Sequence, residues 1–273
     1  MFLLTRPLIR WAGSKRSVLG QIRPRMPINF SSYIEPFCGS AALSFEVSTK
    51  LIVLNDLNER LINFYVQCQS SPKDVYDQYS KFQATKEEYN RLRDIFNKTD
   101  DKLILASIFY FLNRNCFNGL YRTDKSGRFN VPFSSSRIGR PHTREEFLEL
   151  AGRLKGYVLH SGDFELTVGR YLGSGSFFFI DPPYAVARRA PFTEYGPTTF
   201  KPKDISRLLG CLEAIDDSRG KFMLTYSSAS GTTFRLRPTW ELSEVSVQRH
   251  IAGFAGARRR ANEILLTNYA QEQ

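Results

Sequence analysis

Residues 177–186, FFFIDPPYAV, combine an apolar run with an acid, two prolines and a tyrosine, a combination that could do chemistry. The apolar run predicts a strand buried on both faces. Neither proline has an N–H for the sheet, so the strand must end at Asp181. There the carboxylate and the Pro182 carbonyl could accept hydrogen bonds from a weakly nucleophilic amine, while Tyr184 stacks on an aromatic base. On its own, the motif is as typical of an ordinary turn as of such a site.

Two other expected strand ends also carry groups suited to a ligand. In EPFCGSAA, Gly39 and its small neighbours would let a ligand approach the backbone closely. Asp56 follows the apolar run 51–54, where an acid can accept hydrogen bonds from two ribose hydroxyls, although a helix N-cap is an equal alternative. The G-x-G-x-x-G motif of nicotinamide cofactor sites and the spacing of a P-loop are both absent, which counts against those two chemistries.

Apolar strands alternate with helical patterns along much of the chain, which predicts an α/β fold with a mostly parallel sheet. Strands are expected at 33–35 and 51–54 and within 156–164, 175–184 and 219–228. Helices are expected from about Ala41, after Asp56 and over 201–217, and segments 239–251 and 262–270 predict a C-terminal antiparallel hairpin. Because ligands bind outside the carboxyl ends of strands in such sheets, the three strand-end groups should share one edge.

Residues 64–149 do not follow this alternation. They contain two helical patterns, 86–96 and 102–115, followed by a loop-like segment rich in glycine, serine, asparagine and arginine, CFNGLYRTDKSGRFNVPFSSSRIGRP. We interpret residues 64–149 as a mainly helical domain inserted into a first domain that is built from 1–63 and 150–273. The basic loop of this insertion suits contact with a negatively charged partner.

The charge balance indicates a polyanionic partner. The 273 residues include 38 Lys and Arg against 27 Asp and Glu, which gives a net charge of +11 and a pI near 9.6. Nucleic acid is the first expectation and an anionic membrane surface the second, but no segment approaches a membrane-spanning length. The cysteines and histidines are too scattered along the sequence for a metal cluster: Cys38, Cys68, Cys116, Cys211, His142, His160 and His250. We expect the cysteines to be reduced thiols of a cytoplasmic protein.

Six motifs occur in an order that resembles a known family. They are RWAGSKR, YIEPFCGSAAL, LNDLNERLI, FYFLNRNCFNGLYR with GRFNVPF, DPPY with FTEY, and GARRRANEILLTNY. Together they resemble the Dam-type DNA adenine-N6 methyltransferases of the D12 class, in which the S-adenosylmethionine motifs precede the target-recognition insertion. The resemblance runs from about Ile9 to Tyr269. It implies a Rossmann-like methyltransferase sheet and methyl transfer from S-adenosylmethionine to N6 of a flipped-out adenine in double-stranded DNA.

The resemblance also implies roles for individual residues, with Asp56 on the ribose hydroxyls and Asp163 and Phe164 near the cofactor adenine. It implies a catalytic loop of Asp181, Pro182, Pro183 and Tyr184. It implies that the cofactor is contacted by Trp11, Lys15, Pro36, Phe37, Gly39, Asp56, Asp163, Phe164 and Asp181. The residues expected to face DNA are Arg10, Arg114, Asn118, Leu120, Arg122, Arg137, Arg258 and Arg259.

Arginine suits two different DNA contacts in this set. Arg122 matches a base-reading arginine of the family, and the planar guanidinium fits the O6 and N7 atoms of guanine. Arg258 and Arg259 are expected in the loop that joins the last two strands, where we favour phosphate contact over a merely solvated loop.

A core role is the alternative for Trp11. Cys38 is expected to pack in the cofactor loop rather than act as the nucleophile of a cytosine-C5 enzyme.

The sequence departs from the family pattern at a few positions. Ala41 and Ser14 replace glycines of the cofactor motifs, and residues 134–137, SSSR, replace a basic residue and an aromatic after NVPF. Two alternatives stay open. The first is an amino-methyltransferase acting on cytosine N4 or on RNA, although an acid rather than a serine before the two prolines counts against cytosine N4. The second is a DNA-binding protein without activity, which Ala41 and Ser14 would support. We expect a monomer that needs no metal. A GATC target is favoured, and a cognate restriction nuclease is left open.

Overall fold

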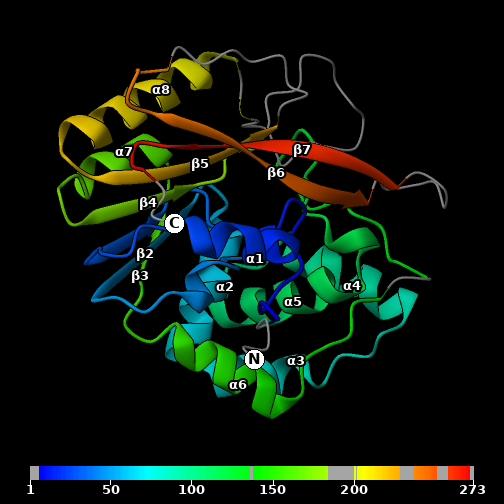
Figure 1. The fold of residues 1–273 in the computed structure, drawn as a ribbon. Coiled ribbons are helices and arrows are strands. Elements are labelled where there is room, and N and C mark those ends of the chain that lie inside the picture. The colour runs from blue at the N-terminus through cyan, green and yellow to red at the C-terminus, as the bar shows by residue number, and fades with distance from the viewer. Residues whose placement is uncertain are drawn as a thin grey trace.

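The computed structural model describes residues 6–135, 138–183, 200, 202–227, 236–250 and 258–270, with the backbone alone for 202, 227, 246–250 and 258–262. Its centre is a seven-stranded sheet (Figure 1). The strands are β1 (Ser32–Glu35), β2 (Leu51–Asp56), β3 (Val158–Ser161), β4 (Ser176–Ile180), β5 (Lys221–Ser227), β6 (Glu241–His250) and β7 (Arg258–Thr267).

The strands lie in the order β3-β2-β1-β4-β5-β7-β6. The first five are parallel, as the alternation of strands and helices predicts. β7 runs antiparallel between β5 and β6, which confirms the C-terminal hairpin. The chain moves from β1 outward to β3 and then returns to β4 on the other side of β1. This reversal makes the β1–β4 boundary a topological switch point, where open α/β sheets bind ligands.

The run of apolar residues in β4 is buried on both faces of the sheet. Phe177 and Phe179 point to one apolar cluster, and Phe178 and Ile180 point to the other. Helices α7 (Phe164–Arg170) and α8 (Pro202–Asp217) cover the second face. Removing each phenylalanine from water contributes about 2–3 kcal/mol, so this central strand is a rigid support for the residues that follow it.

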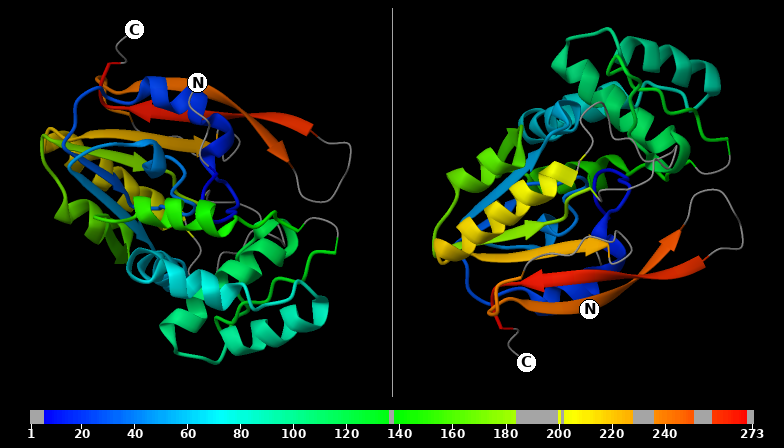
Figure 2. Two further views of the ribbon diagram at one scale, coloured as in Figure 1. Left: turned by 90° about the horizontal axis from the view of Figure 1, so that it is seen from below. Right: turned by 90° about the horizontal axis from the view of Figure 1, so that it is seen from above.

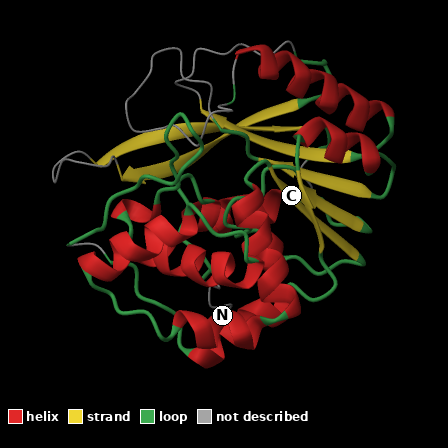
Figure 3. Cartoon of the chain, turned by 180° about the vertical axis from the view of Figure 1, so that it is seen from behind, coloured by secondary structure: helices red, strands yellow, loops and turns green. Residues whose placement is uncertain are grey.

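The opposite face packs against helices that precede β3 in the chain, and Figure 3 shows this larger group across the sheet from α7 and α8. They are α1 (Leu19–Ile22), α2 (Glu59–Ser70), α3 (Pro72–Tyr79), α4 (Lys86–Phe96), α5 (Lys102–Asn115) and α6 (Arg144–Arg153). Both views of Figure 2 show the helices of residues 72–115 gathered to one side of the sheet, away from the β6–β7 hairpin.

The two helical patterns predicted between the second and third strands coincide with α4 and α5. Thr85 and Asp101 cap these helices by accepting hydrogen bonds from the N–H groups of Glu88 and Ile104. α5 is apolar on nearly all sides because it is the buried centre of the helical group. Within the described ranges, no helix combines the length and the apolar character needed to cross a membrane.

Two predictions about secondary structure are wrong. The helix expected from about Ala41 is a series of turns with one short 3-10 helix, η3 (Ser44–Glu46). Gly39 and Ala41 have φ values of 45° and 53°, and this left-handed backbone cannot continue a right-handed helix. Arg258 and Arg259 belong to β7, paired with His250 and Arg249 of β6, rather than to the connecting loop.

Candidate active site

The carboxyl ends of the parallel strands bring the predicted strand-end groups to one edge of the sheet. Pro36 and Phe37 follow β1, Asp56 ends β2, Asp163 follows β3, and Asp181 follows β4. This edge contains the switch point between β1 and β4. The prediction that these groups share an edge is therefore confirmed.

The two oxygens of the Asp181 carboxylate have different surroundings. Oδ1 accepts a hydrogen bond from Thr225 Oγ1 at 2.6 Å and pairs with Lys15 Nζ at 2.7 Å. Thr225 reaches it because β5 lies beside β4, with Leu224 opposite Ile180. No residue in the described part of the chain donates to Oδ2. One oxygen is thus anchored in the protein while the other is available to a substrate donor.

Lys15 is an almost buried ammonium, with 6% of its side chain exposed. It begins the 3-10 helix η1 (Lys15–Val18), which packs near β6. Besides Asp181, its Nζ lies 3.4 Å from Glu263 Oε2 of β7. Burial raises the pKa of Asp181, while the charge and hydrogen bond of Lys15 lower it. The result is an ionisable carboxylate whose affinity for a proton is tuned by its neighbours.

Asp56 is joined to the Gly39 loop by a backbone hydrogen bond. Gly39 N donates to Asp56 Oδ2 at 3.1 Å, and Asn58 N donates to Oδ1 at 3.0 Å. The helix cap of α2 is Asn58, whose Oδ1 accepts from the N–H groups of Arg60 and Leu61, so the N-cap alternative for Asp56 is wrong. Burial raises the pKa of Asp56, and the two N–H donors lower it. Each oxygen keeps a lone pair for a further donor such as a sugar hydroxyl.

Trp11 forms one wall of the same loop. A Cβ on Gly39 would lie 2.7 Å from Trp11 Cδ1, so the indole approaches the backbone as only glycine allows. The other side of the loop is held by Tyr65, whose hydroxyl donates to Gly39 O at 2.7 Å. Trp11 also stacks on Tyr121 at 5.9 Å between ring centroids and stays partly exposed. It therefore belongs both to the core and to the lining of the strand-end site.

Asp163 and Phe164 begin α7 beside Phe37. The rings of Phe37 and Phe164 lie 5.0 Å apart, and Phe200 contacts both at about 6 Å. Asp163 caps α7 through Glu165 N, and its Oδ1 also lies 2.6 Å from Arg207 Nη2 of α8. Arg207 covers the Phe164 ring at 4.8 Å. An aromatic wall next to a fixed carboxylate suits a nucleobase that stacks and donates hydrogen bonds.

Both departures from the glycine pattern have a visible effect on the loop. Ala41 carries the positive φ of 53° that a glycine would adopt without strain. Ser14 Oγ lies 2.8 Å from Ser40 Oγ, so its hydroxyl adds a hydrogen bond between the first motif and the loop. The loop keeps its conformation with these residues, at the expense of local strain at Ala41.

The basic loop of the helical group meets the N-terminal segment at Arg10. Arg10 N donates to Asn113 Oδ1 at 2.9 Å, and Asn113 Nδ2 donates back to Arg10 O at 2.6 Å. The Arg10 side chain lies against Gly119, where a Cβ would be 2.5 Å from Arg10 Cβ, and against Gly139. This contact brings Arg10 next to the 3-10 turn η4 (Phe117–Gly119), which contains Asn118 and is followed by Leu120. Arg122 is oriented by Asn130, which accepts from Arg122 Nε at 2.8 Å.

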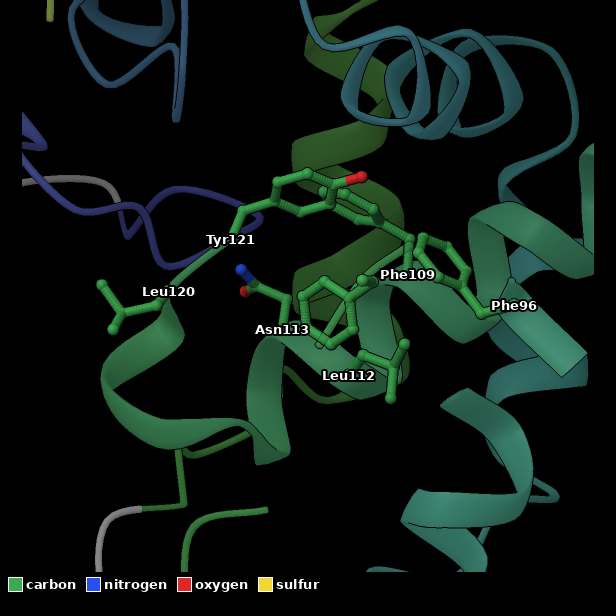
Figure 4. Close-up of a pocket in the computed structure, with 7 residues that line it drawn as sticks. Phe96, Phe109, Leu112, Asn113, Leu120 and Tyr121 are labelled. Atoms are coloured by element: carbon green, nitrogen blue, oxygen red, sulfur yellow. The ribbon is translucent and has the colours of Figure 1, made fainter. Parts of the chain in front are cut away.

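A small apolar pocket lies next to this loop (Figure 4). The ring centroid of Tyr121 lies 5.9 Å from that of Phe109 and 5.4 Å from that of Phe129. The pocket is lined by Phe96, Phe109, Leu112, Asn113, Leu120, Tyr121 and Phe129. Its apolar lining and its place among the helices make it part of the support of the loop rather than a second reaction site.

Arg114 does not face the solvent, and the expectation that it faces DNA is wrong. Only 3% of the residue is exposed. Its Nη2 donates to the Leu8 carbonyl and lies 3.1 Å from His142 Nδ1, and the guanidinium covers the Tyr110 ring at 5.2 Å. Burial lowers the pKa of Arg114. The residue fastens the N-terminal segment to α5.

Replacing Arg114 by methionine is expected to destabilise the protein by about 2–4 kcal/mol, because the Leu8 carbonyl loses a charged donor in a buried place. Urea unfolding measures this change. Arg128→Met is the matched control, since the Arg128 side chain is two-thirds exposed and its ion pair with Asp124 lies in the solvent. Equal stability of the two variants, together with a changed DNA target for Arg114→Met, would contradict the buried role.

The structure does not describe every residue that the sequence predicts for the site. Tyr184 and Arg137 lie outside the described residues, and the side chains of Arg258 and Arg259 do as well. Pro182 and Pro183 extend from Asp181 at the end of β4. Cys38 is 5% exposed, and burial raises the pKa of its thiol, as expected for a packing residue.

Four charged or polar residues of the site were not predicted: Thr225, Glu263, Arg207 and Glu35. Glu35, at the end of β1, is buried and accepts a hydrogen bond from Tyr33 at 2.5 Å. Glu35 and Glu263 have a similar signal in the sequence, an acid directly beside apolar residues of a strand, which is unusual unless the acid has a partner. Thr225 and Arg207 carry no signal of this kind.

Comparisons with known proteins agree with this geometry. The family model of the D12 class N6 adenine-specific DNA methyltransferases matches residues 11–250. The Type II methyltransferase M1.LlaDCHI of Lactococcus lactis subsp. cremoris is 31% identical over 97% of this chain and 95% of its own length. The Type II methyltransferase M.MjaIII of Methanocaldococcus jannaschii is 30% identical over 97% of this chain and 99% of its own length. A DNA adenine methylase of Vibrio cholerae is 30% identical over 95% of each chain. The chain therefore belongs to the D12 class of N6 adenine-specific DNA methyltransferases, and its reaction is the site-specific methylation of adenine N6 in DNA.

Proposed function

We propose that S-adenosylmethionine is the methyl donor and that it binds along the strand-end edge. In this arrangement Asp56 accepts from the ribose hydroxyls, and Phe37 and Phe164 stack on the adenine beside Asp163. Trp11, Pro36 and Gly39 line the sugar and methionine end, next to Lys15. The residues fit such a molecule because the loop offers a close approach at Gly39, and a Cβ there would collide with Trp11.

The catalytic proposal is carried by the asymmetry of Asp181. Lys15 and Thr225 hold Oδ1, so Oδ2 is directed to the amine of the target adenine and accepts its N–H. The Pro182 carbonyl accepts the second N–H, and Tyr184 stacks on the flipped-out base. These acceptors keep the nitrogen lone pair out of the ring and in line for attack. S-Adenosylmethionine supplies a methyl group on a positively charged sulfur, which makes the methyl an electrophile.

In the transfer, the N–C bond would form as the bond between the methyl carbon and the sulfur breaks, and the nitrogen would then have to lose a proton. We assign its first acceptor to Asp181 Oδ2, which is already hydrogen-bonded to that nitrogen in the proposed arrangement. Burial raises the pKa of Asp181, which favours this brief protonation, while Lys15 lowers it and so favours return of the proton to solvent. No covalent bond between enzyme and base is required.

For the DNA contact, we propose that residues 64–149 form the target-recognition domain. Arg10, Asn118, Leu120 and Arg122 then face double-stranded DNA. Arg10 and the turn at Gly119 are in contact, and Arg122 is oriented by Asn130, which supports a shared surface. The net charge of +11 adds attraction for the phosphates. Arg258 and Arg259, at the start of β7, are proposed to contact the phosphate backbone of the DNA.

We further propose that one copy of the chain is the active unit, because a single chain supplies all the strand-end groups. The substrate implies that the enzyme works in the cytoplasm beside the cell's DNA. Two of the relatives are named Type II methyltransferases, which supports a role beside a cognate restriction nuclease.

Methylation-sensitive sequencing of DNA from cells that express this chain tests the proposal. The expected result is N6-methyladenine at one short sequence, absent from cells that carry the empty vector. Mass analysis of the nucleosides separates this outcome from N4-methylcytosine. DNA without any new methylated base, from cells with folded protein, would overturn the proposed reaction.

Replacing Gly39 by alanine is expected to weaken S-adenosylmethionine binding at least about tenfold. The new Cβ would meet Trp11 Cδ1 at 2.7 Å and Nε1 at 2.9 Å, and alanine adopts a φ of +45° only with strain of about 1–2 kcal/mol. Calorimetry measures the affinity. Gly210→Ala is the matched control, because nothing lies within 4 Å of a Cβ on this α8 glycine. Equal affinities for the two variants would remove Gly39 from the proposed cofactor site.

A further inference from the structure

One arginine joins the first turns of two helices at the end of the site where the cofactor adenine is proposed to bind. Arg207, in the second turn of α8, places Nη2 2.6 Å from Asp163 Oδ1 and 2.7 Å from Glu165 Oε2. Its Nε also donates to Glu165 Oε2 at 2.9 Å, and its Nη1 donates to Asp204 Oδ1 at 3.1 Å. All three nitrogens of the guanidinium are engaged, which gives this planar group one defined orientation.

The Asp163 carboxylate is held at one oxygen. Oδ1 accepts a hydrogen bond from Glu165 N at 2.9 Å and another from Arg207 Nη2. Among the residues that the structure describes, none donates to Oδ2, and 37% of the side chain is exposed. Two donors on Oδ1 also fix the direction of Oδ2, because both oxygens belong to one planar group. Oδ2 can therefore accept a hydrogen bond from a ligand in a defined direction.

Arg207 also lies over the aromatic wall of the site. Its Cζ is 4.8 Å from the centroid of the Phe164 ring, a distance at which a guanidinium and a ring attract each other. The Phe37 ring lies 5.0 Å from that of Phe164. The same guanidinium thus contacts both the carboxylate and the ring that follows it, and keeps them in a fixed relation.

We propose that Arg207 is a positioning residue that makes the site selective for a 6-aminopurine, because it directs Asp163 Oδ2 at the exocyclic amine of the cofactor adenine. The proposal rests on the proposed function, which places the adenine beside Phe37, Phe164 and Asp163. A carboxylate oxygen in a fixed direction accepts the N–H of that amine and is left without a partner by a purine that lacks it. Arg207 acts through Asp163 rather than by contact with the cofactor.

The experiment compares S-adenosylhomocysteine with its 6-deamino analogue, in which a hydrogen replaces the adenine amine, by calorimetry in the absence of DNA. The quantity of interest is the ratio of the two affinities. The wild type should prefer the compound with the amine by about tenfold or more, the effect of one hydrogen bond to a charged group. Arg207→Met keeps the aliphatic part of the side chain and removes every donor, so the ratio is expected to fall at least about fivefold.

Arg237→Met is the matched control. Arg237 pairs with Asp216 and Asp217 at the other end of α8 and covers the Trp240 ring at 5.8 Å. The exposed fractions of the Arg237 and Arg207 side chains are 33% and 35%. The two arginines therefore have similar partners and similar exposure, but Arg237 lies away from Asp163, so its replacement should leave the ratio unchanged.

A second pair of variants tests whether Arg207 acts through Asp163. Asp163→Ala removes the proposed acceptor and should abolish the preference for the amine. Adding Arg207→Met to Asp163→Ala should then lower the ratio no further, because a residue that acts only through Asp163 has no separate effect. A clear further fall in the double variant would overturn this route.

The outcomes separate this inference from the proposed function. Wild-type protein that binds neither compound overturns the assignment of the cofactor itself. Wild-type protein that binds both equally well, or an Arg207→Met variant that weakens both by the same factor, overturns the role of Arg207 and leaves the cofactor assignment standing. If Arg207→Met does not fold, Arg207→Lys takes its place. Its ammonium lacks the planar fork, so the ratio should still fall, and an unchanged ratio would overturn the role of Arg207.

Discussion

Replacement of Asp181 by asparagine is expected to lower the rate of methyl transfer at least about a hundredfold while leaving the fold intact. The asparagine oxygen can still accept from Lys15 and Thr225, whose contacts are all on Oδ1. Its NH2 group then takes the place of Oδ2 and presents a donor to the adenine amine, which is itself a donor. Loss of one preorganised hydrogen-bond partner of the reacting group has effects of about this size in other enzymes.

Single-turnover transfer of a labelled methyl group into DNA measures the effect, with circular dichroism to monitor folding. Asp181→Ala should be equally inactive, because it removes both oxygens. Asp94→Asn, an exposed carboxylate of α4, is the control and should retain the wild-type rate. Near-normal transfer by either Asp181 variant would exclude Asp181 as the acceptor of the amine.

Replacement of Glu35 by glutamine should change how stability depends on pH. Burial raises the pKa of Glu35 from an ordinary 4.5 to about 8, because the ionised carboxylate loses its hydration. The folded protein therefore holds this proton more tightly than the unfolded chain does. The associated stability is fully present below pH 4.5, declines as the pH rises, and is lost by about pH 8. At about 1.4 kcal/mol for each pKa unit, the loss amounts to a few kcal/mol.

Glutamine cannot ionise, so Glu35→Gln should match the wild type near pH 5 and exceed its stability by a few kcal/mol above pH 8. Urea unfolding of both proteins from pH 5 to 9 gives the difference between their free energies of unfolding. The contributions of the other titrating groups largely cancel in this difference. Glu149→Gln removes an exposed carboxylate of α6 and should give a nearly constant difference. A constant difference for Glu35→Gln as well would mean that Glu35 is ionised in the folded protein.

Local sequence was sufficient for most of the fold. The bounds of α4 follow from its apolar periodicity, and those of α5 follow from a long apolar run. The end of β4 follows from Pro182 and Pro183, which lack the N–H that a strand needs. The strand-end position of Asp56 and Asp181 also follows, because parallel strands present their carboxyl ends on one edge. These features depend on a few neighbouring residues.

The rest depends on contacts between distant segments, which no local pattern encodes. Arg114 looks like a solvent-facing arginine at the end of a helix, but the Leu8 carbonyl makes a buried position favourable. Ala41 looks like a helix residue, although the backbone around it is left-handed. Thr225 joins the site because β5 lies beside β4, and Glu263 joins it because β7 enters the sheet next to β5. The order of strands in the sheet is not readable from the strands themselves.

The position of β7 also bears on how the chain folds during its synthesis. β7 is inserted between β5 and β6, although both are translated before it. Until residue 263 has left the ribosome, β5 is an edge strand and Lys15 meets Asp181 without Glu263. A nascent chain that has already folded its parallel strands therefore presents the unpaired edge of β5, which favours pairing with other chains until β7 covers it.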